Sequence, residues 1–268
     1  MAIGYGTYAA NQTAAFGSVS IPLALSGVTS GQPIVVFFSC SKYFSGSFAT
    51  TWSDTFSTPY TWTVILNLTS AADANAQLGI LVGTGGSGTS GTITIGGATG
   101  GGSSGKLTFL GGFALPLTGA SLGSGAAIVN NYGYVDSSAV SVSSLAGPSI
   151  TPTVAGSLAL WFTAPLSGTI TVTMPSSPWT TIETNTNTNE PSVSAIINPS
   201  TSAALNPTFS YSNSTEAFNG GILILPPSAT SAPTLPITSN VPVQRAANWF
   251  KRASGLWSPE SGLIPRAA

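Results

Sequence analysis

The stretch Thr169-Ile-Thr-Val-Thr-Met174 alternates between hydroxyl-bearing and apolar side chains. Successive side chains of a β-strand point to opposite faces, so a period of two predicts a strand with one buried face and one wetted face. Ile170, Val172 and Met174 would form the buried face. This alternation sets the expectation for the rest of the chain, which is a protein built from half-buried and fully buried strands.

Short runs of β-branched and aromatic residues recur between turn signals and predict further strands. The expected strands cover residues 34–40, 60–68, 92–95, 107–113, 139–144, 158–163, 169–174, 193–197 and 221–225. Pro165 and Gly168 predict a hairpin that joins 158–163 to 169–174. No helical period of any length precedes residue 240. Together these signals predict an all-β fold, a two-sheet antiparallel sandwich of jelly-roll type.

The chain divides into three expected segments, a β-sandwich body over 1–228, a Pro-rich strap over 229–240 and a basic amphipathic arm over 241–268. Prolines without charge predict an extended strap. Ser239 or Asn240 would cap a short helix in which apolar and basic residues occupy opposite arcs. The residues expected to anchor the arm to a partner are Val243, Arg245, Trp249, Phe250, Lys251, Arg252, Leu256 and Trp257.

Three positions are open for this helix. It can pack on its own sandwich, reach a neighbouring subunit or another protein of a larger assembly, or lie on an anionic membrane. We favour the second position and consider the membrane unlikely as a partner.

Charge is scarce, since only 5% of the 268 residues are charged, and four of the six basic residues follow residue 240. A surface with so little charge favours association over dispersion as a monomer. Residues 1–240 contain only Lys42 and Lys106 against six acids. A body without a basic patch argues against nucleic acid as a partner.

The residues available for catalysis are few. There is no His, which removes the commonest general base and metal ligand, and Cys40 is the single cysteine, expected to be a small buried hydrophobe. A pair of carboxylates could still act as a glycosidase, with candidates in Asp54, Asp136, Glu183, Glu190 and Glu216. Asp54 ends a predicted strand, where an acid commonly accepts backbone N–H groups of a turn. We therefore expect no enzyme activity and no cofactor.

Two glycine-rich motifs resemble nucleotide-binding loops. Gly83-Thr-Gly-Gly-Ser-Gly88 matches G-x-G-x-x-G but runs into the strand expected at 92–95. Gly100–Lys106 begins like a P-loop, but Leu107 stands where Ser or Thr must bind Mg²⁺. Both are interpreted as glycine-rich connections between strands.

Exposed aromatic and amide side chains could instead bind a saccharide, and the candidates are Trp52, Tyr60, Trp179 and Asn187. A carbohydrate-binding, lectin-like module that recognises host surface glycans is therefore an alternative function.

The N-terminal sequence has no basic region followed by an apolar run, and no apolar run approaches the roughly 20 residues that span a bilayer. We expect synthesis in the cytoplasm without a signal peptide. The Ser-, Thr- and Asn-rich body is nevertheless typical of proteins that work outside cells. A virion subunit, made inside the host and released with the particle, satisfies both observations.

Several stretches resemble β-sandwich proteins of tailed bacteriophages. The pattern comprises Gly31-Gln-Pro-Ile-Val-Val-Phe-Phe-Ser39, Thr51-Trp-Ser-Asp54 and Tyr60-Thr-Trp-Thr-Val64, and Gly156–Phe162 and Gly220–Leu225 fit the same scheme. It departs from the usual Asp-x-x-Gly-Asn-x-Tyr form at Ser57-Thr-Pro59. The whole chain resembles minor tail or other virion proteins of phages that infect actinobacteria.

This resemblance implies a structural virion protein without catalytic residues. We expect a minor tail protein on the particle surface, anchored by its C-terminal arm and serving adhesion or particle stabilisation. A capsid decoration protein is the alternative position. A closed homo-oligomer, with a trimer as the specific expectation, would suit either.

Overall fold

The computed structural model describes residues 3–15, 18–41, 48–70, 76–99, 108–120, 123–137, 140–166, 169–186 and 190–227. Residues 1–228 belong to one compact unit. The strap expected at 229–240 and the arm expected at 241–268 lie outside the described residues. Within the described part, no helix is long and apolar enough to cross a membrane.

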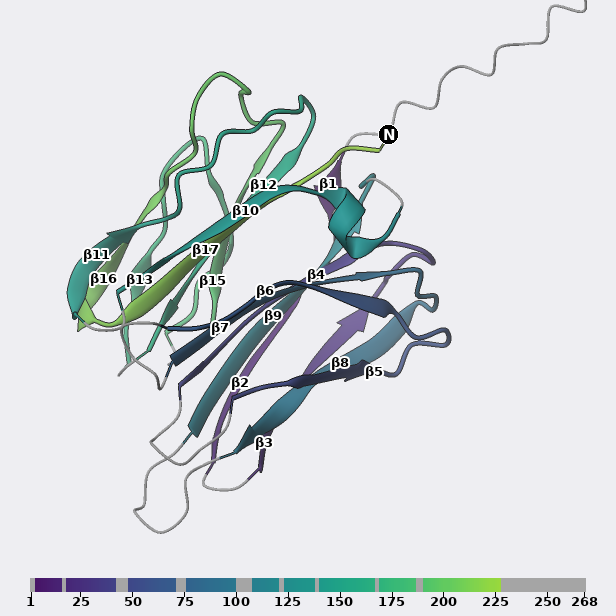
Figure 1. The fold of residues 1–268 in the computed structure, drawn as a ribbon, viewed down its shortest axis with the longest axis horizontal. Helices are drawn as coiled ribbons and strands as arrows, with labels where there is room; N and C mark the ends of the chain where they lie inside the picture. Colours follow the sequence, from purple (N-terminus) through teal and green to yellow (C-terminus); the bar gives the residue numbers. More distant parts are fainter. Residues whose placement is uncertain are drawn as a thin grey trace, which may run out of the picture. The chain divides into compact units, whose positions relative to one another are not determined.

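The described residues form an all-β fold, as predicted, with strands in two successive groups (Figure 1). The first group, in residues 3–120, comprises β1 (Gly4–Tyr5), β2 (Ala9–Ala15), β3 (Ser18–Ser26), β4 (Ile34–Ser41), β5 (Thr51–Asp54), β6 (Thr61–Thr69), β7 (Ala76–Thr84), β8 (Ser90–Thr99) and β9 (Thr108–Thr118). After the single-turn 3-10 helix η1 (Gly125–Ile128), the second group comprises β10 (Val129–Asp136), β11 (Val142–Ala146), β12 (Leu158–Pro165), β13 (Val172–Thr173), β14 (Thr180–Glu183), β15 (Ser192–Ile197), β16 (Thr208–Thr215) and β17 (Ala217–Ile224). We call residues 3–120 the first sandwich and residues 123–227 the second sandwich.

The strands form four antiparallel sheets where the sequence led us to expect two. The inner sheet of the first sandwich has the order β1-β9-β4-β7-β6, with β2 also paired to β9, and its outer sheet has the order β3-β8-β5. In the second sandwich the inner sheet has the order β10-β17-β12-β15-β14 and the outer sheet β11-β16-β13. The two inner sheets pack against each other, and each outer sheet covers the far face of its own inner sheet (Figure 1).

The same pairing scheme occurs twice along the chain. Every pairing among β2–β9 recurs among β10–β17 when each strand number is raised by eight, so that β2·β9 corresponds to β10·β17 and β6·β7 to β14·β15. Only β1 has no counterpart. The register extends the correspondence to single residues, because Phe38 lies opposite Gly112 in the first sandwich and Trp161 lies opposite Gly221 in the second.

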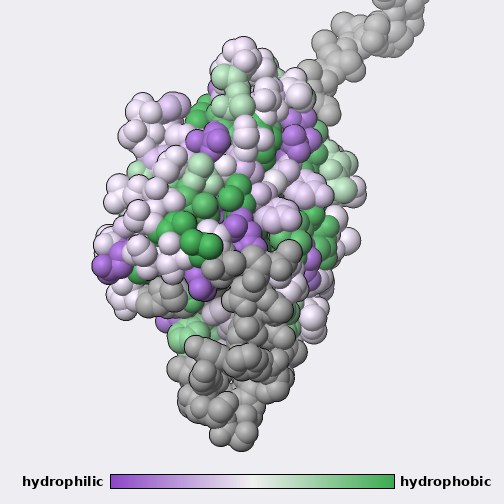
Figure 2. Space-filling model, turned by 60° about the vertical axis from the view of Figure 1, so that its left-hand side comes forward, coloured by the Kyte–Doolittle hydropathy of each residue, from purple (hydrophilic) through white to green (hydrophobic). Residues whose placement is uncertain are grey.

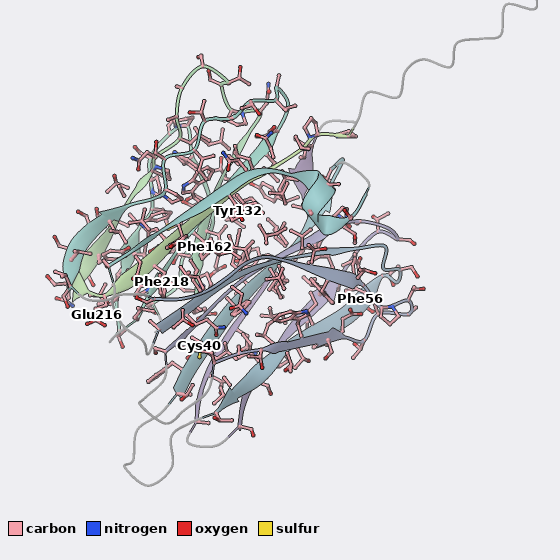
Figure 3. All side chains as sticks on the ribbon, in the orientation of Figure 1. Cys40, Phe56, Tyr132, Phe162, Glu216 and Phe218 are labelled. Carbon is pink, nitrogen blue, oxygen red and sulfur yellow. The ribbon has the colours of Figure 1, made fainter. Side chains whose placement is uncertain are left out.

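Strands in the middle of each inner sheet are buried on both faces, which explains their continuous apolar sequences. In β4, Phe37 points into the central core between the two inner sheets, while Phe38 points into the first outer core beneath β3-β8-β5. In β12, Phe162 joins the central core and Trp161 joins the second outer core beneath β11-β16-β13. Phe162 and Phe218 lie between the inner sheets (Figure 3).

Glycines inside these strands make room for aromatic rings. A Cβ at Gly79 would lie 2.0 Å from the ring of Phe38, and one at Gly221 would lie 2.3 Å from the ring of Trp161. These distances are far below any van der Waals contact, so the ring occupies the space that a side chain would need. The high glycine content of the strands is therefore part of the core packing.

Contacts from both sandwiches hold the central core together. Phe37 stacks on Phe162 with ring centroids 4.1 Å apart, and Tyr8 stacks on Phe113 at 5.1 Å. A hydrogen bond to Glu183, together with burial and the charge of that carboxylate, raises the pKa of Tyr8 to about 12. Tyr8 precedes β2 and Glu183 ends β14, so this pair joins the first sandwich to the second.

The prediction that a hairpin joins 158–163 to 169–174 is wrong. β12 pairs with β15 and β17 in the inner sheet, whereas β13 pairs only with β16 in the outer sheet. The chain crosses between sheets at this point, and local turn residues do not distinguish a crossing from a hairpin. The alternation itself is confirmed, because Ile170 and Val172 are buried, Met174 is half-buried, and Thr169, Thr171 and Thr173 are exposed.

Three edge strands of the inner sheets carry β-bulges. An extra residue interrupts the register of β6 between Val64 and Leu66, of β10 between Val129 and Asn131, and of β14 between Thr181 and Glu183. Edge strands are usually protected by lysine, proline or bulges. The described residues include no lysine or arginine. Bulges on β6, β10 and β14 limit edge-to-edge pairing at these strands.

Candidate functional site

Carboxylates are spread over the fold and are engaged by other groups. Asp54 lies in an outer sheet, Asp136 ends β10 and accepts a hydrogen bond from the Ser70 hydroxyl at 2.5 Å, and Glu183 lies beside Tyr8. Among the described residues, no cluster of three or more His, Cys, Asp or Glu side chains could bind a metal ion. Each of the three acids interacts with other groups of the chain and therefore has a structural role.

Asp54 organises the turn that follows β5. Its Oδ1 accepts the backbone N–H of Phe56 at 3.2 Å, and its Oδ2 accepts the backbone N–H of Tyr60 at 3.0 Å and the indole N–H of Trp62 at 2.9 Å. The prediction that Asp54 accepts backbone N–H groups in a turn is confirmed. One side chain thus fixes the connection between β5 and β6.

Tyr60 is part of the core beside this turn. Only 5% of its surface is exposed, its hydroxyl donates to the Gln32 carbonyl at 3.0 Å, and its ring meets Phe56 edge-on at 5.0 Å. Burial, and then the nearby charge of Asp54, raises the pKa of Tyr60. Its ring therefore has almost no free face on which a sugar could stack.

The Gly83–Gly88 motif is packed into the same region. It connects β7 to β8, so a strand follows it, as predicted, and not a helix. A Cβ at Gly83 would meet the ring of Trp62 at 2.7 Å, and one at Gly86 would meet the ring of Tyr60 at 2.1 Å. The glycines serve close packing, while Gly100–Lys106 lies outside the described residues.

The saccharide candidates chosen from the sequence do not form one site. Trp52 and Tyr60 pack at the first outer core, and Trp179 meets Trp161 edge-on at 5.3 Å at the second outer core. Both inner sheets lie between these two cores, and Asn187 lies outside the described residues. The anchoring residues Val243, Arg245, Trp249, Phe250, Lys251, Arg252, Leu256 and Trp257 also lie outside them.

We expect Asp54→Ala to lower the free energy of unfolding by about 2–3 kcal/mol, because the N–H groups of Phe56, Tyr60 and Trp62 lose a charged acceptor. For a unit of this size the loss corresponds to a fall in melting temperature of roughly 4–12 °C. Thermal and urea denaturation would measure it. Ser53→Ala, at the exposed neighbour in β5, is the matched control and should stay close to wild type. An equally small effect of both substitutions would contradict the role assigned to Asp54.

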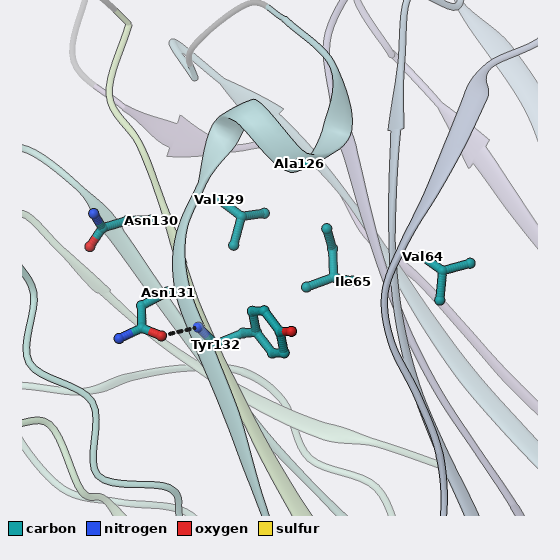
Figure 4. A pocket seen from close by; sticks show the side chains of 7 residues that line it. All are labelled: Val64, Ile65, Ala126, Val129, Asn130, Asn131 and Tyr132. Atoms are coloured by element: carbon teal, nitrogen blue, oxygen red, sulfur yellow. Dashed lines mark hydrogen bonds between the residues drawn. The ribbon is translucent and has the colours of Figure 1, made fainter.

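A hollow of about 260 Å³ opens between β6 and β10 (Figure 4). It lies beside η1, where the chain passes from the first sandwich to the second. Its lining consists of Val64, Ile65, Ala126, Val129, Asn130, Asn131 and Tyr132. The bulges of β6 and β10 both fall within this lining. None of the lining residues is charged.

Tyr132 is the one aromatic residue among those lining the hollow, and 47% of its surface is accessible. Its ring lies between β10 and β6, close to Ile65, whereas Val64 points away (Figure 4). Asn131 accepts the backbone N–H of Tyr132 through Oδ1 at 2.8 Å, and Asn130 exchanges hydrogen bonds with Thr153 at 2.9 and 3.1 Å. This site was not predicted from the sequence. The short stretch Asn130-Asn-Tyr132, which combines amide and aromatic side chains, is the only local feature of the sequence that could have indicated it.

A second hollow, of about 220 Å³, is lined by Gly31, Pro33, Thr84, Gly85 and Gly123. It offers no aromatic ring and no titratable group. The hollow at Tyr132 is therefore the better candidate for binding a ligand.

Comparison of the chain with protein-family models, with curated proteins and with solved structures gave no match.

Proposed function

We propose that the protein is a non-catalytic structural subunit of a tailed-bacteriophage virion, a minor tail protein whose body consists of two jelly rolls in tandem. A jelly roll winds eight strands into two sheets, and this architecture is frequent in viral capsid and lectin domains. The pairing scheme that occurs in β2–β9 and again in β10–β17 supports the proposal. It matches a jelly roll except that β6 and β14, the fifth strand of each set, extend the inner sheet.

The twice-occurring pairing scheme is the observation that carries this proposal. The composition adds support, because residues 1–228 contain only two basic side chains, Lys42 and Lys106, and the described carboxylates of Asp54 and Asp136 are engaged within the fold. On the face in Figure 2, residues of intermediate hydropathy prevail, with scattered hydrophobic and hydrophilic patches. A weakly charged surface of this kind suits a subunit held in an assembly better than a dispersed enzyme.

The attachment would run through the C-terminal segment, with Trp249, Phe250, Leu256 and Trp257 buried in a groove of another virion protein. Arg245, Lys251 and Arg252 would pair with acids at its rim. A homotrimer made in the host cytoplasm and incorporated into the particle remains the expected form. A capsid decoration protein would use the same attachment at a different place.

Full-length protein should form oligomers or join particles, whereas a chain ending at Pro236 should remain a monomer and stay off the particle. Light scattering at several concentrations and particle fractionation would measure the two effects, and separated heads and tails would distinguish a tail from a capsid position. Phe250→Ala tests the segment by a point change, with Gln244→Ala on the opposite helical arc as its control. Normal occupancy of the shortened chain would refute this mode of attachment.

A further inference from the structure

The two inner sheets meet along two seams that correspond under the repeated pairing scheme. One seam lies between β14 and the segment entering β2, and the other lies between β6 and β10. In the repeated scheme β6 of the first sandwich corresponds to β14 of the second, and β2 corresponds to β10. The seam between β6 and β10 and the seam between β14 and β2 therefore occupy equivalent places in the fold. At the first seam, Tyr8 lies beside the Glu183 carboxylate, which raises its pKa, and stacks on Phe113. The second seam contains the hollow at Tyr132.

Two bulges shape this second seam. The extra residue of β6 is at Ile65 and that of β10 is at Asn130, and both line the hollow. Bulges turn side chains away from the regular strand positions and are frequent beside functional sites. Ligand sites are also frequent where two packed modules meet. The hollow therefore combines two local features that favour a binding site.

One polar group of the hollow has unused hydrogen-bonding capacity. No described residue bonds the hydroxyl of Tyr132, whereas the Asn131 amide lies on the other side of β10 from the ring (Figure 4). The ring of Tyr132, with Ile65 and Val129 beside it, supplies an apolar surface. Asp136, on the same face of β10, is bonded to Ser70. The lining thus offers an aromatic face and a hydroxyl, without charge.

We propose that this hollow binds one neutral sugar residue, such as the terminal residue of a glycan. A sugar ring presents C–H groups that pack on an aromatic face and hydroxyls that exchange hydrogen bonds with phenol groups. The uncharged lining provides no partner for a phosphate, a carboxylate or an ammonium group. The volume, about 260 Å³, is below the ~300–1,000 Å³ of sites for larger small molecules, so it suits a single ring. This site goes beyond the structural role and uses none of the aromatic residues selected from the sequence.

The test uses full-length protein and saturation-transfer NMR with galactose, glucose, mannose, arabinose and N-acetylglucosamine, beside glucosamine and glucuronic acid as charged probes. We expect a signal from at least one neutral sugar and weaker or no signal from its charged relatives. Tyr132→Ala should weaken binding at least about tenfold, because it removes the aromatic face. Tyr134→Ala is the matched control: Tyr134 is 43% exposed on the same face of β10 and does not line the hollow.

Tyr132→Phe separates stacking from hydrogen bonding and should keep most of the affinity, with the melting temperature of each variant confirming an intact fold. Absence of a signal from every neutral sugar would overturn the proposal. So would binding that survives in Tyr132→Ala or disappears equally in Tyr134→Ala. A change of oligomeric mass in Tyr132→Ala without any sugar signal would assign the hollow to a second copy of the chain instead. Particle attachment is not measured here, so either proposal can fail without the other.

Discussion

Gly221→Ala should lower the free energy of unfolding by about 3 kcal/mol, a loss typical of severe overpacking in a core. The new methyl group would lie 2.3 Å from Cε2 of Trp161. The ring has little room to move away, since it is fully buried, its indole N–H donates to the Pro148 carbonyl at 3.2 Å, and Trp179 packs against its edge. Urea denaturation of the purified protein would measure the change.

Gly6→Ala is the matched control for this substitution. A Cβ at Gly6 would meet its nearest neighbour, Cβ of Pro116, at an ordinary 3.7 Å, so we expect a change within about 1 kcal/mol. A double-mutant cycle adds a sharper criterion. In a Trp161→Leu background Gly221→Ala should cost much less than in wild type, because the colliding ring is gone. Equal costs in the two backgrounds would show that the ring is not the reason for glycine at this position.

Separating the two sandwiches should abolish folding of both. Residues 1–121 and 122–228, produced as separate chains, should each aggregate or remain unfolded, whereas co-expression should give a soluble one-to-one complex. The central core draws fully buried side chains from both sandwiches, including Phe37, Phe113, Phe162 and Phe218. Exposing a buried side chain of this size costs about 1.5–3 kcal/mol, and several such losses exceed the roughly 5–15 kcal/mol by which domains are stable.

The control for this separation is the intact chain with a protease site between Ala120 and Gly123, cut after folding. We expect the cut protein to remain together at nearly the same melting temperature until denatured. Size-exclusion chromatography and thermal melts would follow all three samples. A cooperative melt of either sandwich as a soluble monomer would contradict the idea that the central core is shared.

The sequence signals were sufficient for the strands in which pattern and burial agree. β4 and β12 were expected from their apolar runs, and β13 lies within the stretch whose alternation was clearest. β7 was missed because Gly79 and Gly83 interrupt its apolar run, and only the packed structure shows that Phe38 and Trp62 occupy the missing volume. β3 was also missed, although its residues alternate strictly between exposed and buried; it contains Pro22, which is tolerated because β3 is at a sheet edge.

The number of sheets depended on contacts that no local pattern contains. A run such as Ile34–Phe38 predicts a strand covered on both faces, but it does not say what covers it. Asp54 could be assigned a role because a turn acceptor acts within a few residues of its own position. The hollow at Tyr132 could not be predicted in the same way. It depends on Ile65 and Asn130, which come from strands of different sandwiches and are displaced by bulges that only the strand register reveals.

The pairing scheme that occurs twice also bears on the descent of the chain. Two modules with the same strand order, joined by a short link, have the form that duplication and fusion of one gene leaves behind. In a homodimeric ancestor the interface now found at the central core would have been isologous, and its two seams identical by symmetry. In a homodimer a substitution changes both seams at once, whereas in a single fused chain it changes only one. In the present chain Tyr8 and Glu183 lie at one seam, while the other is open around Tyr132, so the two seams are equivalent in strand order but differ in their side chains.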